Sequence, residues 1–586
     1  MKDADKPDES STATEDNQPS QTEAPSPEQK NVEIVTDDDG PATVAGEKLE
    51  QVGAATPERA AHAEVSTGRS AFFVGAGILI SRIVGLIRQR IFAYYFGSSA
   101  EGDAFSAAFR IPNFLQNVFG EGALSASFIP VYAKLLAQDD EKEAARVANA
   151  IFSILALVTA VIVLIGVFAT PYIVTVIAAG FEEERRALTI TLVRIFFPGA
   201  ALLVLSAWCL GVLNSHHRFF ISYTAPVAWN AAIIAALLFF GNRVDLSSLA
   251  AATAWGSVIG SALQFGVQLP TVLRLIHDLR PVLTFSSPHV SQVLNNFFPV
   301  FVSRGVVQIS AFVDTVLASF LGQGAVVALN YAQSLYTLPV SLFGMSVSAA
   351  ELPAMSRAMG AASVVAETLR RRLDQGLQRI SFFIVPSAVA FLALGDVIAA
   401  VLYQTGKFTR DDSIYVWTIL AGASVGLLAS TLGRLYSSTY YALQDTRTPL
   451  LYAVLRVGLG SILGYFFSIH VPGLLGLDSR LGAAGLTIAS GLAGWVEFVL
   501  LRHSLNQKIG RTGLPLSYSA KLWLGALLGA AVGWGLKLLV TGWHPIPLAI
   551  VVLGGYGTCY FAVTYLLGIA EAQTIIRRIL RMARLI

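Results

Sequence analysis

Charged residues are scarce in this sequence of 586 residues. Only 14% of them are Asp, Glu, Lys or Arg, whereas 54% are hydrophobic and the mean hydropathy is +0.60. A soluble globular chain carries about 25% charged residues, so the composition excludes that class. Apolar runs of about twenty residues recur from near residue 71 to the end, which excludes a single signal peptide as their source. The sequence predicts a polytopic membrane protein.

Cysteines and catalytic motifs are also rare or missing. Cys209 and Cys559 lie in apolar runs, without the CxxC or Cys/His spacing of a metal or redox site. No GxxxxGK[ST], HExxH, GxSxG or paired-acid motif stands in a position to act. These absences favour a transporter over an enzyme and make a sodium or proton gradient, or the substrate's own gradient, the expected energy source. No nucleic-acid partner is expected.

Residues 1–69 lack apolar periodicity and almost all aromatic side chains. They carry 16 acidic and 6 basic residues, a net charge near −10, while the rest of the chain is near +12. Such a segment cannot bury enough apolar surface to fold. We predict a disordered, acidic cytoplasmic tail.

Apolar windows separated by polar or Gly/Pro breaks predict fourteen membrane helices. These begin near residues 71, 104, 147, 187, 223, 248, 289, 324, 372, 411, 447, 481, 518 and 545. Connections on the side of the tail are rich in Lys and Arg, and those on the other side hold only Arg185, Arg186, Arg243, Lys407, Arg410 and Arg480. The positive-inside rule therefore predicts a chain in the cytoplasmic (inner) membrane with both termini in the cytoplasm.

The sequence repeats itself at an offset of roughly 225 residues, with the order of the matches preserved. The paired segments include Ser81-Arg82 with Ser303-Arg304, Phe119-Gly120 with Phe343-Gly344, and Gly180-Phe181 with Gly406-Lys407-Phe408. Because each copy spans six helices, the repeats are parallel. The predicted fold is all-α, with six-helix lobes in residues 70–282 and 283–510, and two further helices with a basic end in residues 511–586. Such lobes are typical of alternating-access transporters with a site near the midplane.

The first predicted helix carries a polar stripe. Ser81, Arg82, Gly85, Arg88 and Gln89 fall within a sector ~120° wide, and the rest of the helix is apolar. Arg82 and Arg88 lie near the helix centre, too deep to reach either surface easily. A charge at this depth must line a cavity or pair with an acid, and this helix supplies no acid to the stripe. The stripe is therefore a candidate substrate site.

The seventh and second predicted helices are polar as well. The seventh carries Ser303, Arg304, Gln308, Ser310 and Asp314 in one broad sector. Asp314 is either a cation ligand or the partner of Arg304. The second carries Asp103, Arg110, Pro112, Asn113, Gln116, Glu121 and Gly122, a composition that is tolerated in a membrane helix where the helix lines a cavity.

Two acids of the second helix have alternative roles. Asp103 either caps the N-terminus of that helix or belongs to the site. Glu121 lies deeper, and it either balances the arginines or carries a proton. Arg456 and Glu497, on the eleventh and twelfth helices, are expected to pair with each other.

The deep arginines indicate an anionic substrate. Guanidinium groups bind phosphate in bidentate fashion and stay charged when dehydrated. A lipid-linked diphosphate fits this site, because its head group would cross in the polar cavity while its tail stayed among the membrane lipids.

Several segments resemble the MurJ (MviN) lipid II flippase family. They are Ser81-Arg82-Ile83-Val84-Gly85-Leu86-Ile87-Arg88, Asp103-Ala104-Phe105, Arg110-Ile111-Pro112-Asn113, Phe119-Gly120-Glu121-Gly122, Tyr403-Gln404-Thr405-Gly406-Lys407-Phe408 and Ala442-Leu443-Gln444-Asp445-Thr446-Arg447. The resemblance implies fourteen helices in two lobes, within the multidrug/oligosaccharidyl-lipid/polysaccharide exporter superfamily. It implies movement of lipid-linked peptidoglycan precursor from the inner to the outer leaflet, with Arg82 and Arg88 at the diphosphate. It also implies that Asp103 corresponds to an acidic residue that the family has at the start of the second helix, and Glu121 to the Glu of a Glu-Gly pair in the same helix.

The sequence departs from this family at three positions. Gln116 stands where the family has an arginine, and Gln333 and Ser334 stand where members have an acid followed by an arginine. Either Arg110 or Arg304 compensates for the missing charges, or the substrate is another undecaprenyl-diphosphate-linked, O-antigen-like glycan. Asp314 resembles a sodium-ligating acid of some members. A third hypothesis is a non-transporting scaffold whose acidic tail binds cell-wall synthesis proteins.

Overall fold

The computed structural model describes residues 77, 79–276, 280, 287–358 and 361–582. In this part the chain forms helices and no β-strand. The predicted disordered tail, residues 1–69, lies outside the described residues. The all-α prediction is confirmed.

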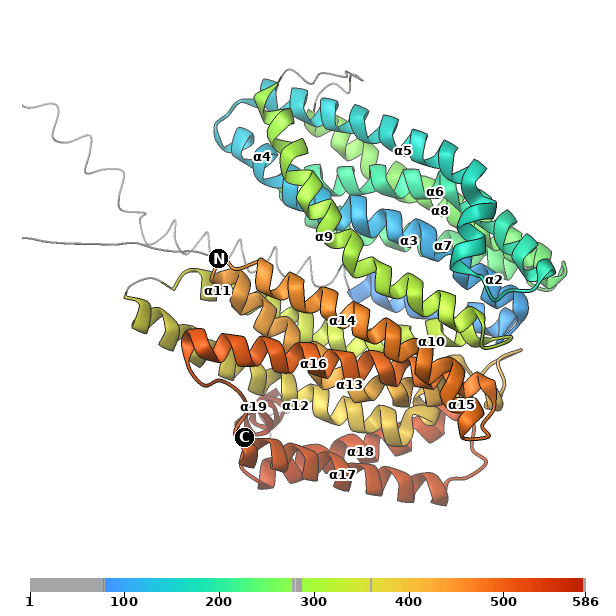
Figure 1. The fold of residues 1–586 in the computed structure, drawn as a ribbon, viewed down its shortest axis with the longest axis vertical. Helices are drawn as coiled ribbons and strands as arrows, with labels where there is room; N and C mark the ends of the chain where they lie inside the picture. Colours follow the sequence, from blue (N-terminus) through green and yellow to red (C-terminus); the bar gives the residue numbers. More distant parts are fainter. Residues whose placement is uncertain (1–76, 78, 277–279, 281–286, 359–360, 583–586) are drawn as a thin grey trace, which may run out of the picture. The chain divides into compact units, whose positions relative to one another are not determined.

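The helices follow one another along the chain with short connections (Figure 1). The first half comprises the helix 79–96, α2 (Ala100–Ala108), α3 (Arg110–Leu115), η1 (Gln116–Leu124), α4 (Ser125–Ala137), α5 (Glu141–Ile177), α6 (Glu183–Ser215), α7 (Phe219–Phe240) and α8 (Leu246–Ile276). The second half comprises α9 (Pro288–Ser319), α10 (Ala325–Pro339), η2 (Val340–Met345), α11 (Ser346–Ser356), α12 (Ala362–Tyr403), α13 (Arg410–Ala442), α14 (Arg447–Tyr465), η3 (Phe466–His470), α15 (Val471–Leu474), η4 (Ser479–Leu481) and α16 (Gly482–Ile509). The chain ends with α17 (Leu516–Leu539), α18 (Pro545–Leu566) and α19 (Ala570–Met582).

Eleven helices of the described residues are long and apolar enough to cross a membrane. Three further helical stretches, 79–96, 100–137 and 288–319, lie where the remaining predicted helices fall. Each of these three stretches carries charged or amide side chains, which lowers its hydropathy. The protein is therefore a multi-pass membrane protein, and the count of fourteen spans stays a prediction.

The second predicted helix is irregular, as its polar and helix-breaking residues indicate. It runs through α2, α3, the π-helical segment η1 and α4. A second π-helical segment, η2, separates α10 from α11 in the second half. Phe119-Gly120 lies in η1 and its repeat partner Phe343-Gly344 lies in η2, so the two sequence copies adopt the same local irregularity. Such π-helical turns occur frequently at functional sites.

Each half has its own pairwise helix packing. In the first half α6 packs on α5 and α8, and α8 packs on α7; in the second half α13 packs on α12 and α16, and α16 packs on α14. Small residues permit these contacts: Gly426 of α13 and Gly491 of α16 meet where any side chain would clash. Arg90 joins the halves, because its Nη1 donates to the carbonyls of Val401 (2.6 Å) and Leu402 (3.0 Å).

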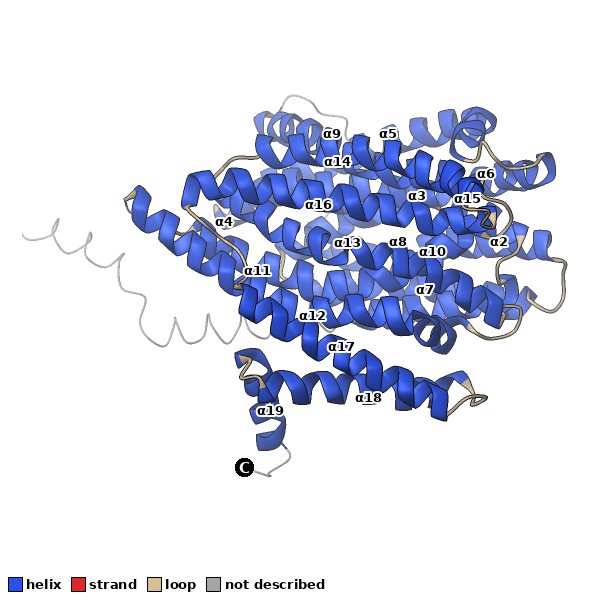
Figure 2. Ribbon diagram, turned by 60° about the horizontal axis from the view of Figure 1, so that its bottom comes forward, coloured by secondary structure: helices blue, strands red, loops and turns tan. Residues whose placement is uncertain are grey.

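The last three helices follow the second half, and two of them pack against it. α17 and α18 lie side by side against α12 (Figure 2). Tyr556 and Tyr560 of α18 donate to carbonyls of α12, at Pro386 and Phe382, and both hydrogen bonds are 2.6 Å long. α19 turns away from α18 and presents Arg577 and Arg578 at its surface. The sequence analysis did not separate this last helix from the basic C-terminal end.

The loop between α13 and α14 gives a pH-dependent prediction. The Lys508 ammonium, 2.5 Å away, and the backbone N–H and hydroxyl of Thr448 lower the pKa of Asp445 to about 2. Because this folded pKa lies below the unfolded value of about 3.9, the stabilisation is complete above about pH 4 and is lost as the pH falls towards 2. The pair is partly exposed, so Asp445→Asn should cost less than about 1 kcal/mol at pH 7.

The measurement is the melting temperature of the parent and of Asp445→Asn at pH 7 and at pH 3. We expect the small difference at pH 7 to shrink at pH 3. A difference that grows on acidification would contradict the assignment.

Candidate functional site

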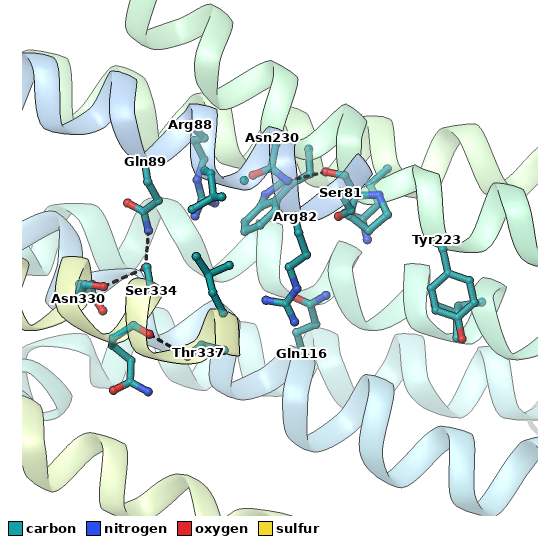
Figure 3. Close-up of a pocket in the computed structure, with 18 of the residues that line it drawn as sticks. Ser81, Arg82, Arg88, Gln89, Gln116, Tyr223, Asn230, Asn330, Ser334 and Thr337 are labelled. Atoms are coloured by element: carbon teal, nitrogen blue, oxygen red, sulfur yellow. Dashed lines mark hydrogen bonds between the residues drawn. The ribbon is translucent and has the colours of Figure 1, made fainter. Parts of the chain in front are cut away.

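A polar cavity of about 790 Å³ lies between the two halves. Its lining comes from the helix 79–96, η1, α4, α6, α7, α8 and α10, with Ser81, Arg82, Arg88, Gln89, Gln116, Asn214, Tyr223, Trp229, Asn230, Gln264, Asn330, Gln333, Ser334 and Thr337 among its residues (Figure 3). We call it the central cavity. The described residues that line it include two arginines and no carboxylate, so the cavity is positively charged.

The two arginines differ in how they are held. The guanidinium carbon of Arg88 lies 5.4 Å from the ring centroid of Phe109 and 5.3 Å from that of Trp229, and these two rings stack on each other. Cation–π contacts of this kind fix the position of a charge without neutralising it. Arg82 is exposed to the cavity. Within the described part of the chain neither arginine forms an ion pair within 4.0 Å, and Nη1 of Arg88 is buried without a hydrogen-bond partner.

Amide and hydroxyl side chains make up much of the remaining polar lining. Gln89 donates to the hydroxyl of Ser334 at 3.3 Å, which connects the helix 79–96 with α10 (Figure 3). The Ser334 hydroxyl in turn donates to the Asn330 carbonyl at 2.9 Å. Amides both donate and accept hydrogen bonds, so they suit the hydroxyl and acetamido groups of a glycan as well as phosphate oxygens.

A smaller cavity of about 300 Å³ adjoins the central cavity. The two share Arg88, Gln89, Asn330 and Ser334, and the smaller one is also lined by Arg110 and Asn113. The first half of the chain thus brings three arginines to the joined cavities.

Asp103 lies away from these cavities, at one end of the helices. The positive-inside rule assigns this end to the outside of the cell, and we call this end the outer end. Its carboxylate is completely buried and accepts hydrogen bonds from the backbone N–H groups of Gly324 (2.6 Å) and Val327 (2.9 Å). Arg185 lies 3.6 Å from it. Asp103 therefore caps the N-terminus of α10, a helix of the other half, where no side chain of α10's own N-cap does so.

Of the two roles expected for Asp103, the capping of its own helix is not the one observed. Ser99 is the N-cap of α2, and its hydroxyl accepts from the N–H of Gly102 at 3.1 Å. Asp103 sits one turn further on and points across the interface between the halves. Its role is to hold the outer end of the two halves together.

Two hydrogen bonds donated by backbone N–H groups, related by the internal repeat, complete this closure. The N–H of Lys407 donates to the carbonyl of Tyr94 at 2.8 Å, beside Gly97, whose φ of +51° places it in the left-handed region. A β-carbon at Gly97 would lie 2.7 Å from the Lys407 carbonyl oxygen, so only glycine fits there. In the other copy the N–H of Gly180 donates to the Ser319 hydroxyl at 2.9 Å.

An aromatic plug separates the central cavity from this outer closure. It consists of Phe92, Phe96, Phe105, Tyr331 and Tyr403, with ring centroids 4.5 Å apart for Phe92 and Phe96 and 4.9 Å apart for Tyr331 and Tyr403. In the opposite direction the cavity extends to Asn214 and Tyr223, which lie at the last turn of α6 and the first turn of α7. The cavity is therefore closed towards the outer end and reaches the inner ends of the helices.

A third cavity, of about 240 Å³, lies within the second half, and we call it the second-half cavity. Asp314 of α9 and Arg456 of α14 line it together with Arg110. Arg456 pairs with Glu497 of α16 at 3.2 Å, which confirms that predicted pair. No group of three or more His, Cys, Asp or Glu side chains suited to a metal occurs among the described residues. Arg110 and Arg456 border the same cavity as Asp314, and their positive charges oppose the binding of a cation there.

The predicted site residues thus separate into three groups. Ser81, Arg82, Arg88, Gln89 and Gln116 line the central cavity, Arg110 and Asn113 line its neighbour, and Asp103 and Asp314 lie elsewhere. The side chains of Glu121 and Arg304 lie outside the described residues. The sequence analysis missed Trp229, Asn230, Gln264 and Asn330. An amide inside an otherwise apolar window was the signal available for the last three.

This architecture has a counterpart among solved structures. The fold matches the solved structure of an inward-facing multidrug resistance MATE family transporter of the MOP superfamily, with a TM-score of 0.61 at 17% identity over 73% of this chain and 98% of that chain. At this identity the likeness concerns the fold alone. Two helical halves around a central polar cavity are thus a fold that this chain shares with that transporter.

The chain belongs to the lipid II flippase MurJ family, whose model matches residues 92–554. The lipid II flippase MurJ of Burkholderia cenocepacia is 32% identical over 75% of this chain and 84% of its own length. A probable lipid II flippase MurJ of Rhizobium meliloti is 30% identical over 87% of this chain and 95% of its own. The solved structure of a lipid II flippase MurJ in an inward closed conformation matches with a TM-score of 0.70, at 26% identity, over 85% of this chain and 98% of that chain.

Proposed function

We propose that this protein moves lipid II, the lipid-linked peptidoglycan precursor, from the inner to the outer leaflet of the cytoplasmic membrane by alternating access. The observation that carries the proposal is the central cavity, which Arg82 and Arg88 line together and to which the described residues contribute no carboxylate. Membership of the MurJ family supports lipid II as the cargo.

Arg88 and Arg82 bind the diphosphate in this proposal. Arg88 is held against Phe109 and Trp229, so little side-chain freedom is lost when its guanidinium meets a phosphate. Its buried Nη1 gains the hydrogen bond that it lacks without substrate. The amides of the lining receive the sugars, and the polyprenyl tail remains among the membrane lipids.

Transport requires the cavity to change the side on which it opens. The closure at the outer end must separate, which breaks the hydrogen bonds of Asp103 to Gly324 and Val327 and the contact between Tyr94 and Lys407. The inner ends of the helices must then approach each other. The closure is built from a few hydrogen bonds and stacked rings, so each half can move as a body.

A second cargo is favoured by the neutral side chains at three lining positions. Gln116, Gln333 and Ser334 hydrogen-bond but carry no charge. An O-antigen-like glycan on undecaprenyl diphosphate would meet the same two arginines and the same amides. Competition between lipid II and such a glycan lipid for binding to the purified protein separates these two cargoes.

The proposal is tested by expressing the chain in cells depleted of their own lipid II flippase. We expect growth to be rescued and lipid II to reach the outer leaflet. A stably inserted parent that fails to rescue, while a polyprenyl-linked glycan competes for binding, would favour the second cargo.

A truncated chain that lacks residues 1–65 separates transport from scaffolding in the same cells. A flippase should keep most of its activity without these residues. A scaffold that docks cell-wall synthesis proteins through them should lose its function while the chain remains inserted.

A further inference from the structure

The second-half cavity combines four charges from four helices. Arg110 of α3, Asp314 of α9 and Arg456 of α14 line it, and Glu497 of α16 holds Arg456 at 3.2 Å. Counted over the described side chains, two positive and two negative charges sum to zero, so these four balance one another without an external ion.

Asp314 faces the cavity rather than a direct partner. Among the described residues no basic group lies within 4.0 Å of its carboxylate, and Arg110 and Arg456 act on it electrostatically across the cavity. A carboxylate in this position, surrounded by hydroxyl groups, is the kind of oxygen ligand that a hard cation takes. The two guanidinium groups supply positive charge to the same space.

The neighbouring oxygens are also engaged. The hydroxyls of Tyr336 and Ser430 bond to each other at 2.6 Å, and the Thr487 hydroxyl donates to the carbonyls of Ile419 and Ala484, both at 2.9 Å. A cation at Asp314 would have to compete with these hydrogen bonds and with both arginines.

Arg110 gives the cluster a connection to the substrate cavity. It is the charged side chain, among the described lining residues, that borders both the second-half cavity and the cavity adjoining Arg88. Its Nε is buried, and no group in the described part of the chain forms a hydrogen bond with it. The positive charge near Asp314 is therefore shared with the space in which the diphosphate is proposed to bind.

We propose that Arg456, fixed by Glu497 and assisted by Arg110, is a built-in cation for Asp314, so that the second-half cavity binds no sodium and transport does not use a sodium gradient. This inference rests on the proposed function only where it concerns transport. The exclusion of sodium from Asp314 is a property of the folded chain and is measured without lipid II.

The first measurement is binding of radioactive sodium and the melting temperature of the purified full chain, in NaCl and in choline chloride at equal ionic strength. We expect no saturable sodium binding and equal melting temperatures for the parent. Sodium binding by the parent that is lost in Asp314→Asn would overturn the proposal.

The second measurement removes the internal cation. In Arg456→Gln the cluster gains a net negative charge, so we expect sodium binding and a sodium-specific rise in melting temperature of about 2–4 °C at saturating sodium. The double variant Arg456→Gln/Asp314→Asn is the matched control and should lose both effects. If Arg456→Gln is folded but does not bind sodium, the assignment of Arg456 as the built-in cation is wrong.

Two further tests complete the design. Arg456→Gln/Glu497→Gln removes one charge of each sign and leaves no unpaired Glu497, so the cluster stays neutral and this variant should not bind sodium. Sodium binding by it would overturn the proposal, even where Arg456→Gln alone does not fold. In proteoliposomes, collapse of a sodium gradient should leave lipid II transport by the parent unchanged. A parent that transports lipid II only with a sodium gradient contradicts the inference, whereas a parent that transports no lipid II contradicts the proposed function and leaves the binding result standing.

Discussion

Replacing Arg88 by alanine should lower the rate of lipid II transport by about 10- to 150-fold. This factor corresponds to the ~1.5–3 kcal/mol that a hydrogen bond to a charged group contributes. Arg88 is held against the stacked rings of Phe109 and Trp229, and its Nη1 is buried without a hydrogen-bond partner among the described residues, so its loss removes a positioned contact with the phosphate. The measurement is the initial rate of lipid II appearance in the outer leaflet.

The controls for this prediction are chosen by position. Arg88→Lys keeps the charge but loses the bidentate geometry, so an intermediate rate is expected. Arg194→Ala removes an exposed arginine of α6 that lines none of the three cavities, and its rate should equal that of the parent. Normal transport by both Arg82→Ala and Arg88→Ala would refute the assignment of the central cavity.

The second large effect is expected at the outer end, where Asp103→Ala should open the closure. The substitution removes the cap of α10 and leaves the guanidinium of Arg185, only 11% exposed, without its carboxylate. Breaking a buried pair of this kind costs about 3–5 kcal/mol, which is enough to reverse an equilibrium between closed and open states. We expect transport to fall because one state becomes dominant.

Labelling of a single cysteine detects this opening. Ser106 is buried and lines the cavity adjoining the central one, so Ser106→Cys, in a chain whose Cys209 and Cys559 are replaced, reports access from outside. A membrane-impermeant thiol reagent should label it in Asp103→Ala cells but not in the parent. Ser99→Ala, which removes only the cap of α2, should leave labelling low; equal labelling of both variants would argue against a closure role for Asp103.

The membrane fold was predictable because its signals are local. Apolar windows place most helix starts within a few residues, as at Arg410 of α13 and Pro545 of α18. The repeat was visible in pairs such as Phe119-Gly120 and Phe343-Gly344, which both lie in π-helical segments. The polar stripe of the first helix was visible because helical periodicity brings Arg82 and Arg88 to one face.

Long-range partners could not be predicted in this way. Asp103 stands at a helix start, where an acidic residue usually caps its own helix, and the backbone N–H groups that donate to it, of Gly324 and Val327, are more than 200 residues away. The environment of Asp314 depends on Arg110 and Arg456, from other helices. Helical periodicity describes one helix at a time, so it does not show which charges from different helices share a cavity.

Reconstitution of the purified protein with lipid II in liposomes is the most direct test of the central claim. The quantity measured is the rate at which lipid II becomes accessible to an enzyme on the opposite side of the membrane, for the parent, for Arg88→Ala and for liposomes without protein. We predict that the parent moves lipid II much faster than empty liposomes do. The rate for Arg88→Ala should be close to that of empty liposomes. A parent no faster than empty liposomes, or an Arg88→Ala variant as fast as the parent, would contradict the account.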